Sequence, residues 1–273
     1  MELYFYVMIF CFGVIIGSFL NVVIYRMHTG KSINGRSHCM TCGTHLSWYE
    51  LFPIFSYLAQ GAKCRHCTAY IPSRYLLVES VTGVAFVALW YLFHTTPILF
   101  VLYALLVAIF IVLCVYDIRH TIIPDELTLA VGGVALLLLM YAWYGGQSPV
   151  TLLYSVLSGL CASAFFGGLW YMSKGKWLGF GDVKLAFPLG VIVGIGGVFS
   201  MIVLSFWVGA ALSLILLGLQ RILKRGKPSL LFLPAPLTIK SEVPFAPFLI
   251  SGFILAHFFH ADIFTITSFF LPW

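Results

Sequence analysis

Charged residues are scarce in this sequence. Asp, Glu, Lys and Arg make up 9% of its 273 residues, only nine residues are acidic, and 61% are hydrophobic. A soluble domain carries about 25% charged residues, so this chain lacks the polar side chains needed to cover a water-facing surface of its size. That shortage excludes a soluble globular enzyme, a disordered protein and a disulfide-rich secreted scaffold. The mean hydropathy of +1.02 instead predicts an all-α polytopic membrane protein.

Apolar runs suited to crossing a bilayer occur eight times, and we expect them to form a single membrane domain over residues 1–273. A transmembrane helix needs about 20 mostly apolar residues, and none of the runs alternates in polarity as the strands of a membrane barrel do. The sixth and seventh runs share one apolar stretch, which we divide at residues 194–197 because glycine favours a tight turn. The predicted spans cover residues 3–25, 75–93, 98–116, 127–144, 150–172, 183–199, 201–220 and 243–261.

The basic residues are distributed on one side of this scheme. All fifteen Lys and Arg fall in or beside loops on the same face, whereas the opposite loops, 94–97 and 145–149, contain no charged residue. By the positive-inside rule the basic face is cytoplasmic and both termini lie outside. The first run has no basic flank and no clear cleavage site, so we expect a retained helix and not a signal peptide. The net charge of +6 thus indicates orientation in a lipid bilayer, and we expect no nucleic-acid partner.

The one sizeable polar segment, residues 26–74, contains two cysteine pairs. Cys39 and Cys42 form one Cys-x-x-Cys motif and Cys64 and Cys67 the other, with 21 residues between the pairs. This spacing is close to that of zinc ribbons, and four thiolates would close a tetrahedral shell, which makes the zinc structural. A redox pair and disulfides are the alternatives, although a reducing cytoplasm disfavours disulfides. Three histidines lie near enough in sequence to replace one cysteine ligand: His38, His45 and His66.

Five of the nine acidic residues lie in or beside the predicted spans, where an ionisable group is costly and marks a candidate functional site. They are Glu79, Asp117, Asp125, Glu126 and Asp182.

Asp117 and Asp182 are expected at the same membrane depth. Asp117 follows the third span and Asp182 precedes the sixth, so the two intervening spans return the chain to the same face. Two facing carboxyl groups in a partly desolvated place cannot both ionise cheaply and share a proton. The ionised member can then accept a proton from water while the protonated member polarises a peptide carbonyl, as in aspartyl proteolysis.

Each acidic residue also has a structural alternative. Asp117 could pair with Arg119, and Asp182 could cap the sixth helix. Asp125 follows Pro124, and we interpret it as a capping residue in a favourable position relative to the helix dipole.

Several motifs resemble those of the bacterial type IV prepilin peptidases, also called leader peptidase/N-methyltransferases, a family of GxGD membrane aspartyl proteases. They are Gly17-Ser-Phe-Leu-Asn-Val-Val-Ile-Tyr-Arg26, the two cysteine pairs with their flanks, Asp117-Ile-Arg-His-Thr-Ile-Ile-Pro-Asp125 and Gly179-Phe-Gly-Asp-Val-Lys-Leu185. The resemblance implies that Asp117 and Asp182 are catalytic. It also implies a peptidase core over residues 75–273 and a zinc-binding cytoplasmic loop, 26–74, linked to methylation.

The resemblance further implies what the enzyme acts on. Members cleave type IV prepilins and pseudopilins after a glycine, on the cytoplasmic side of the bacterial inner membrane. They then methylate the new N-terminus with S-adenosylmethionine. The resemblance suggests a cofactor site near Asn21, Arg26 and Glu79, where hydrogen bonding between helices is the alternative role. A different class of function stays open, namely a transporter or proton or ion carrier that uses Asp117 and Asp182.

The sequence departs from the family pattern in two places. Leu76 replaces a proline, and Gly61-Ala-Lys63 is a variant of the segment before the second cysteine pair. Both lie in the region linked to methylation and away from the aspartates. The chain has no G-x-G-x-x-G motif after a strand, so a Rossmann domain for the methyl donor is not expected.

Overall fold

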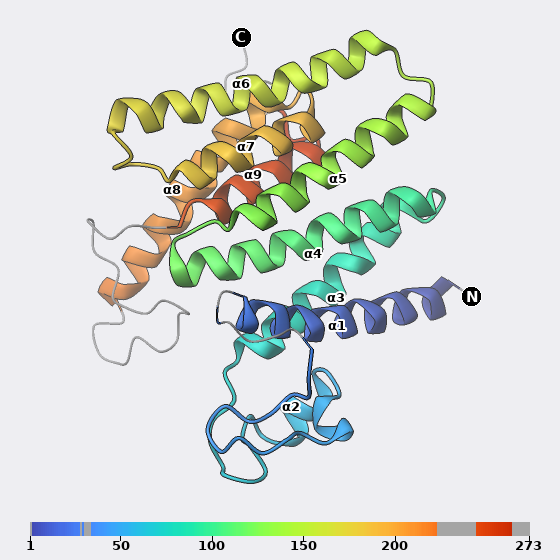
Figure 1. Cartoon of the computed structure of the whole chain (residues 1–273), viewed down its shortest axis with the longest axis vertical. Coiled ribbons are helices and arrows are strands. Elements are labelled where there is room, and N and C mark those ends of the chain that lie inside the picture. Colours follow the sequence, from blue (N-terminus) through green and yellow to red (C-terminus); the bar gives the residue numbers. More distant parts are fainter. Residues whose placement is uncertain (1, 28, 30–33, 223–243, 264–273) are drawn as a thin grey trace. The chain divides into compact units, whose positions relative to one another are not determined.

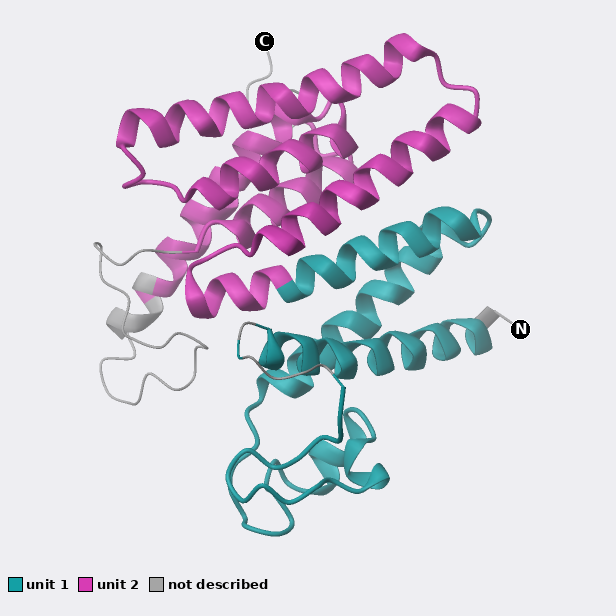
Figure 2. Ribbon diagram, viewed as in Figure 1, with its two compact units in different colours: residues 1–112 teal, residues 113–273 magenta. Residues whose placement is uncertain are grey.

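The computed structural model describes residues 2–27, 29, 34–222 and 244–263, and these are almost entirely helical (Figure 1). Within these ranges, β-pairing is limited to two isolated bridges, His38 with His45 and Lys63 with Tyr70. The predicted all-α class is therefore confirmed. The chain divides into two compact units, residues 1–112 and 113–273 (Figure 2).

The first unit combines long helices with the polar segment. It contains α1 (Glu2–Arg26), α3 (Arg74–Phe93) and the first two thirds of α4 (Pro97–His120). Between α1 and α3 the chain forms two short helices, η1 (Trp48–Leu51) and α2 (Phe55–Ala59).

Two glycines bring α1 and α3 close together. A Cβ atom on Gly13 would lie 2.9 Å from the Cα of Gly83, and one on Gly17 would lie 2.8 Å from the Cα of Glu79. Small residues spaced in this way let helix backbones approach within a membrane. Gly13-x-x-x-Gly17 is therefore a helix-contact motif.

The second unit is built around α7 (Phe180–Val193). This helix packs against α5 (Asp125–Tyr144), α6 (Pro149–Ser173), α8 (Val198–Ile222) and α9 (Ala246–Phe258) (Figure 1). Three of its side chains, Leu185, Ala186 and Leu189, are completely buried. The central helix of this unit is thus surrounded by protein, and it carries Asp182 near its start.

A helix occurs at each of the eight predicted places, and the turn at 194–197 is confirmed because α7 ends at Val193 and α8 begins at Val198. Six helices, α1, α3, α4, α5, α6 and α8, are long and apolar enough to cross a membrane. The other two, α7 with 14 residues and α9 with 13, are only about 20 Å long, against a hydrocarbon core of roughly 30 Å. The chain is a multi-pass membrane protein by these criteria, but the count of eight spans is not confirmed.

Glycines also bring α6 and α7 close together in the second unit. A Cβ on Gly190 would lie 2.8 Å from the Cα of Gly159, and the Ser158 hydroxyl donates to the Gly190 carbonyl at 2.6 Å. Gly194 has no described atom within 4 Å of its Cβ position and has a φ of +77°. It ends α7 in a conformation that glycine adopts readily.

Substituting Gly159 should destabilise the second unit. The Cβ of Gly159→Ala would lie 2.5 Å from the Cγ2 of Val191 and 2.7 Å from the Phe187 carbonyl oxygen. Overpacking of this kind costs about 1–3 kcal/mol, so the midpoint of thermal unfolding in detergent should fall. Gly168→Ala on the same helix is the matched control, since nothing lies within 4 Å of its Cβ position. Equal midpoints for both variants would contradict the close contact.

Candidate active site and metal centre

The second unit brings the two predicted aspartates together. Asp117 lies in the last turn of α4 and Asp182 in the first turn of α7, with exposed fractions of 4% and 6%. Their carboxyl groups are close enough to interact electrostatically. The paired-carboxylate hypothesis requires an interaction of this kind between the two groups.

The Asp117 carboxylate is held by the start of α9. Its Oδ2 accepts a hydrogen bond of 3.1 Å from the backbone N–H of Ala246, the first residue of that helix, which is itself fully buried. A helix N-terminus favours a nearby negative charge. Among the described residues Asp117 forms no ion pair with Arg119, whose side chain is exposed. The alternative ion-pair role of Asp117 is therefore wrong.

Asp182 is buried with one oxygen unpaired. Gly179, not Asp182, is the N-cap residue of α7, so the capping alternative is wrong. The Oδ1 atom of Asp182 is inaccessible and has no hydrogen-bond partner in the described structure. Such an atom costs free energy unless something occupies the site. It is therefore a candidate partner for a water molecule or a substrate carbonyl.

The second glycine of the Gly179-Phe-Gly-Asp182 motif has a packing role. A Cβ on Gly181 would lie 2.8 Å from the Cβ of Ile123, in the segment between α4 and α5. Gly179 has a φ of −71°, so its backbone needs no left-handed conformation. Gly181 therefore permits a close approach, and the approaching group is the Ile123 side chain.

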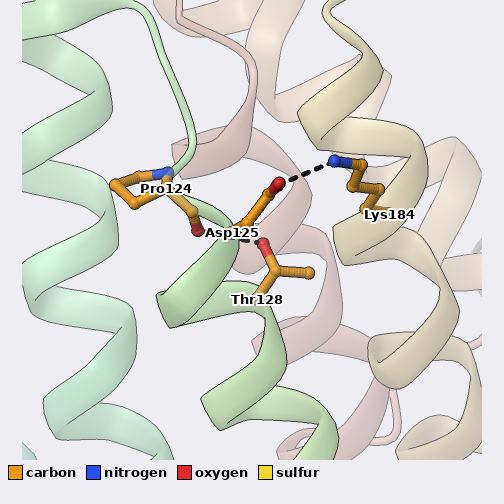
Figure 3. Close-up of polar contacts among 4 residues, drawn as sticks. All are labelled: Pro124, Asp125, Thr128 and Lys184. Carbon is orange, nitrogen blue, oxygen red and sulfur yellow. Dashed lines mark hydrogen bonds and ion pairs between the residues drawn. The ribbon is translucent and has the colours of Figure 1, made fainter.

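Asp125 has a different role from the one expected. The N-cap residue of α5 is Pro124, and Asp125 occupies the first turn without forming a side-chain cap. Its Oδ1 accepts a hydrogen bond of 2.8 Å from the Lys184 ammonium on α7 (Figure 3). Both side chains are exposed, and surface ion pairs contribute only about 0–1 kcal/mol. The capping prediction is wrong in detail, although the position in the first turn still favours the negative charge.

Replacing Gly181 should weaken the active site through Ile123. Gly181→Ala forces the Ile123 side chain to move, since the new Cβ would meet its Cβ, Cγ1 and Cδ1 atoms. We expect peptide cleavage to fall, and the double variant Gly181→Ala/Ile123→Gly, which removes the clashing Cβ, to recover part of it. Gly133→Ala in α5 is the control, because its Cβ would point into open space. The measurement is the initial rate of product formation, and full activity of Gly181→Ala would refute the packing role.

The four predicted cysteine ligands meet in the first unit. The Sγ atoms of Cys39, Cys42, Cys64 and Cys67 all lie within 4.8 Å of one another, and all four are free thiols. The group contains no histidine, so His38, His45 and His66 are not needed as ligands. Four sulfur donors at this separation fit a tetrahedral structural metal site.

Each cysteine pair lies in a tight turn of the same design. In the first turn Cys39 N–H donates to Thr44 O and Gly43 N–H to Cys39 O, and in the second Cys64 N–H donates to Ala69 O and Thr68 N–H to Cys64 O. Hydrogen bonds with the side chain and backbone of Thr44 lower the pKa of the Cys42 thiol to about 6. A low pKa favours the thiolate, which is the form that binds metal.

Loss of one cysteine should release the metal. We expect one equivalent of zinc per purified chain by inductively coupled plasma mass spectrometry, and much less in Cys64→Ser, because three thiolates no longer close the tetrahedral shell. Cys161→Ser is the control, since Cys161 lies on α6 outside the cluster. Metal content that is absent in the unmodified chain, or unchanged in Cys64→Ser, would contradict the four-cysteine site.

The residues suggested as a cofactor site are buried in the first unit and hydrogen-bonded. Asn21 on α1 donates to the Tyr75 carbonyl on α3 at 3.2 Å, which is the interhelical bond given as its alternative. Glu79 Oε2 accepts from the Ile54 N–H at 2.8 Å. Arg26 donates to the backbone carbonyls of Asn34 and Arg36.

The described residues thus form a helical membrane protein with a buried aspartate pair and a four-cysteine cluster. Comparisons with known proteins agree with this class. The model of the bacterial peptidase A24 N-terminal domain matches residues 11–93 and that of the type IV leader peptidase family matches residues 104–214. The chain belongs to the type IV leader peptidase family.

Curated relatives carry the name prepilin leader peptidase/N-methyltransferase. The one from Vibrio cholerae is 32% identical over 222 residues, which cover 74% of this chain and 83% of the relative. The Bacillus subtilis relative is 27% identical over 92% of this chain and 93% of its own length. The Myxococcus xanthus relative is 42% identical, over 48% of this chain and 40% of the relative. No solved structure matches the chain. The transporter alternative is not favoured by these findings.

Proposed function

We propose that this protein is a membrane aspartyl endopeptidase that removes the leader from type IV prepilins or pseudopilins and then methylates the new N-terminus. Membership of the type IV leader peptidase family and the names of the relatives support both activities. The observation that carries the proposal is the electrostatic pairing of two buried aspartates, Asp117 and Asp182, in one unit.

The surroundings of the two carboxyl groups give them different roles. Asp117 accepts the Ala246 N–H, a contact that favours its ionised form, whereas Asp182 Oδ1 has no donor. We therefore place the shared proton on Asp182, with the pair titrating as one coupled system. Asp117 accepts a proton from water, whose oxygen attacks the scissile carbonyl carbon, and Asp182 gives its proton to the carbonyl oxygen. Collapse of the tetrahedral intermediate breaks the C–N bond, and the leaving amine takes a proton from the pair.

The site is proposed to face the cytoplasm of a bacterial inner membrane. Asp117 ends α4 and Asp182 begins α7, and basic residues follow or flank both positions: Arg119, Lys174, Lys176 and Lys184. The positive-inside rule assigns that face to the cytoplasm. In this scheme residues 75–273 hold the peptidase core, and residues 26–74 form a cytoplasmic loop in which Cys39, Cys42, Cys64 and Cys67 hold a structural zinc ion.

Methyl transfer requires S-adenosylmethionine as the donor. The deprotonated amine nitrogen of the new N-terminus attacks the methyl carbon, and the carbon–sulfur bond breaks with its electron pair passing to sulfur. The resulting secondary ammonium can release a proton to water. The products are the methylated peptide and S-adenosylhomocysteine.

Removal of either paired carboxylate should abolish cleavage. General acid–base groups contribute about 10²–10⁴-fold to rate, so Asp117→Asn and Asp182→Asn should each lower the initial rate at least about 100-fold. The measurement is mass spectrometry of a prepilin incubated with purified enzyme in detergent. Asp125→Asn is the matched control, because Asp125 is exposed and paired with Lys184. Substantial cleavage by folded Asp117→Asn or Asp182→Asn would overturn the proposed mechanism.

A further inference from the structure

The first unit encloses a cavity of about 300 Å³ that the proteolytic mechanism does not use. Its wall is formed by the end of α1, the start of α3 and the polar segment between them. Ligand pockets have volumes of roughly 300–1,000 Å³, so the cavity is large enough for a small organic molecule.

One wall includes a carboxylate group with one oxygen unpartnered. Glu50 is 6% exposed, and its Oε2 accepts the Ser47 N–H at 2.8 Å. Its Oε1 is buried and has no hydrogen-bond partner in the part of the chain that the structure describes. A buried carboxylate oxygen without a donor is costly, and Glu50 lines the cavity. A ligand that brings a cationic donor would remove this cost.

Another wall includes a guanidinium group with one nitrogen unpartnered. The Nη2 atom of Arg74 contacts the Tyr75 hydroxyl at 3.4 Å, but Nη1 is buried and lacks a partner among the described residues. Arg74 also lines the cavity. The unpartnered Nη1 of the guanidinium is a charged donor suited to a carboxylate oxygen.

The remaining lining is largely apolar and aromatic. Tyr25, Tyr57 and Tyr75 contribute to it, together with Val22 and Leu46. Aromatic side chains of this kind bind planar rings by stacking or edge contacts. The cavity therefore fits a molecule that combines an ammonium group, a carboxylate and an aromatic ring system.

We propose that this cavity is the binding site for S-adenosylmethionine, with Arg74 pairing with the carboxylate of the methionine moiety and Glu50 with its ammonium group. The inference rests on the proposed function, because methyl transfer is what requires this donor. The adenine ring would lie against the tyrosines. Glu79, a second acidic residue of the lining, would face the positively charged sulfonium. Transfer then moves the methyl group from sulfur to the substrate amine, leaving S-adenosylhomocysteine in the cavity and one proton in water.

The test is a direct measurement of binding on the full-length protein in detergent, by equilibrium dialysis with radiolabelled S-adenosylmethionine. Loss of one charged hydrogen-bond partner should raise the dissociation constant about tenfold or more in Glu50→Gln and in Arg74→Gln. Arg74→Lys keeps the charge without the planar guanidinium group. Its dissociation constant should lie between those of Arg74→Gln and the unmodified chain. Arg36→Gln is the control, since Arg36 is exposed and outside the lining. Thermal unfolding midpoints identify any variant that has lost its fold.

Three results would separate failure of this site from failure of the proposed function. Unmodified enzyme that methylates a cleaved prepilin, together with unchanged affinity in folded Glu50→Gln and Arg74→Gln, overturns the site and leaves the function standing. Enzyme that neither binds the donor nor methylates overturns the methyltransferase function itself. A zwitterionic lipid headgroup shares the charge pattern, so displacement of the label by phosphatidylethanolamine vesicles, but not by S-adenosylhomocysteine, would also overturn the site.

Discussion

A carboxylate buried among apolar helices must be compensated, and in this protein the compensation comes from a backbone group. The Ala246 N–H points at Asp117 Oδ2 from the first turn of α9. This donor belongs to a helix terminus, where backbone N–H groups have no partner within the helix. The contact thus gives a hydrogen-bond partner both to the buried Asp117 carboxylate and to the buried N–H of Ala246. Without it the Asp117 carboxylate would be buried without this donor, and an ionised base would be hard to maintain.

The arrangement of α7 follows from the same requirement. Asp182 is near the start of a 14-residue helix that is packed against four others. A helix enclosed by protein does not have to match the thickness of the bilayer, and its interior position removes Asp182 from lipid. Both short helices begin at the aspartate pair, because α7 carries Asp182 in its first turn and α9 donates its first N–H to Asp117. This explains in physical terms why an expectation based on bilayer thickness placed the end of the sixth span too late.

The sequence contained enough to predict the helices, the pair of aspartates and the four-cysteine cluster. Long apolar runs, rare acidic residues and regular cysteine spacing are local signals that are visible in the sequence alone. The contact between Asp117 and Ala246 has no such signal, because a backbone N–H is present at every residue other than proline and the partners are 129 residues apart. The ion pair of Asp125 with Lys184 was missed for a similar reason. Only the packing of α5 on α7 brings these two motifs together.

The four-cysteine cluster and the cavity of the first unit share part of their structure. Cys39 and Cys64, one from each cysteine pair, belong both to the sulfur cluster and to the cavity lining. The polar segment is too short to build a large core of its own, so cross-linking its two turns through a metal would fix the wall that carries Glu50. A charged group positions a ligand only when its own location is fixed. On this view the metal acts at a distance from any reacting atom, by keeping the unpaired carboxylate of Glu50 and the guanidinium of Arg74 on walls of one cavity.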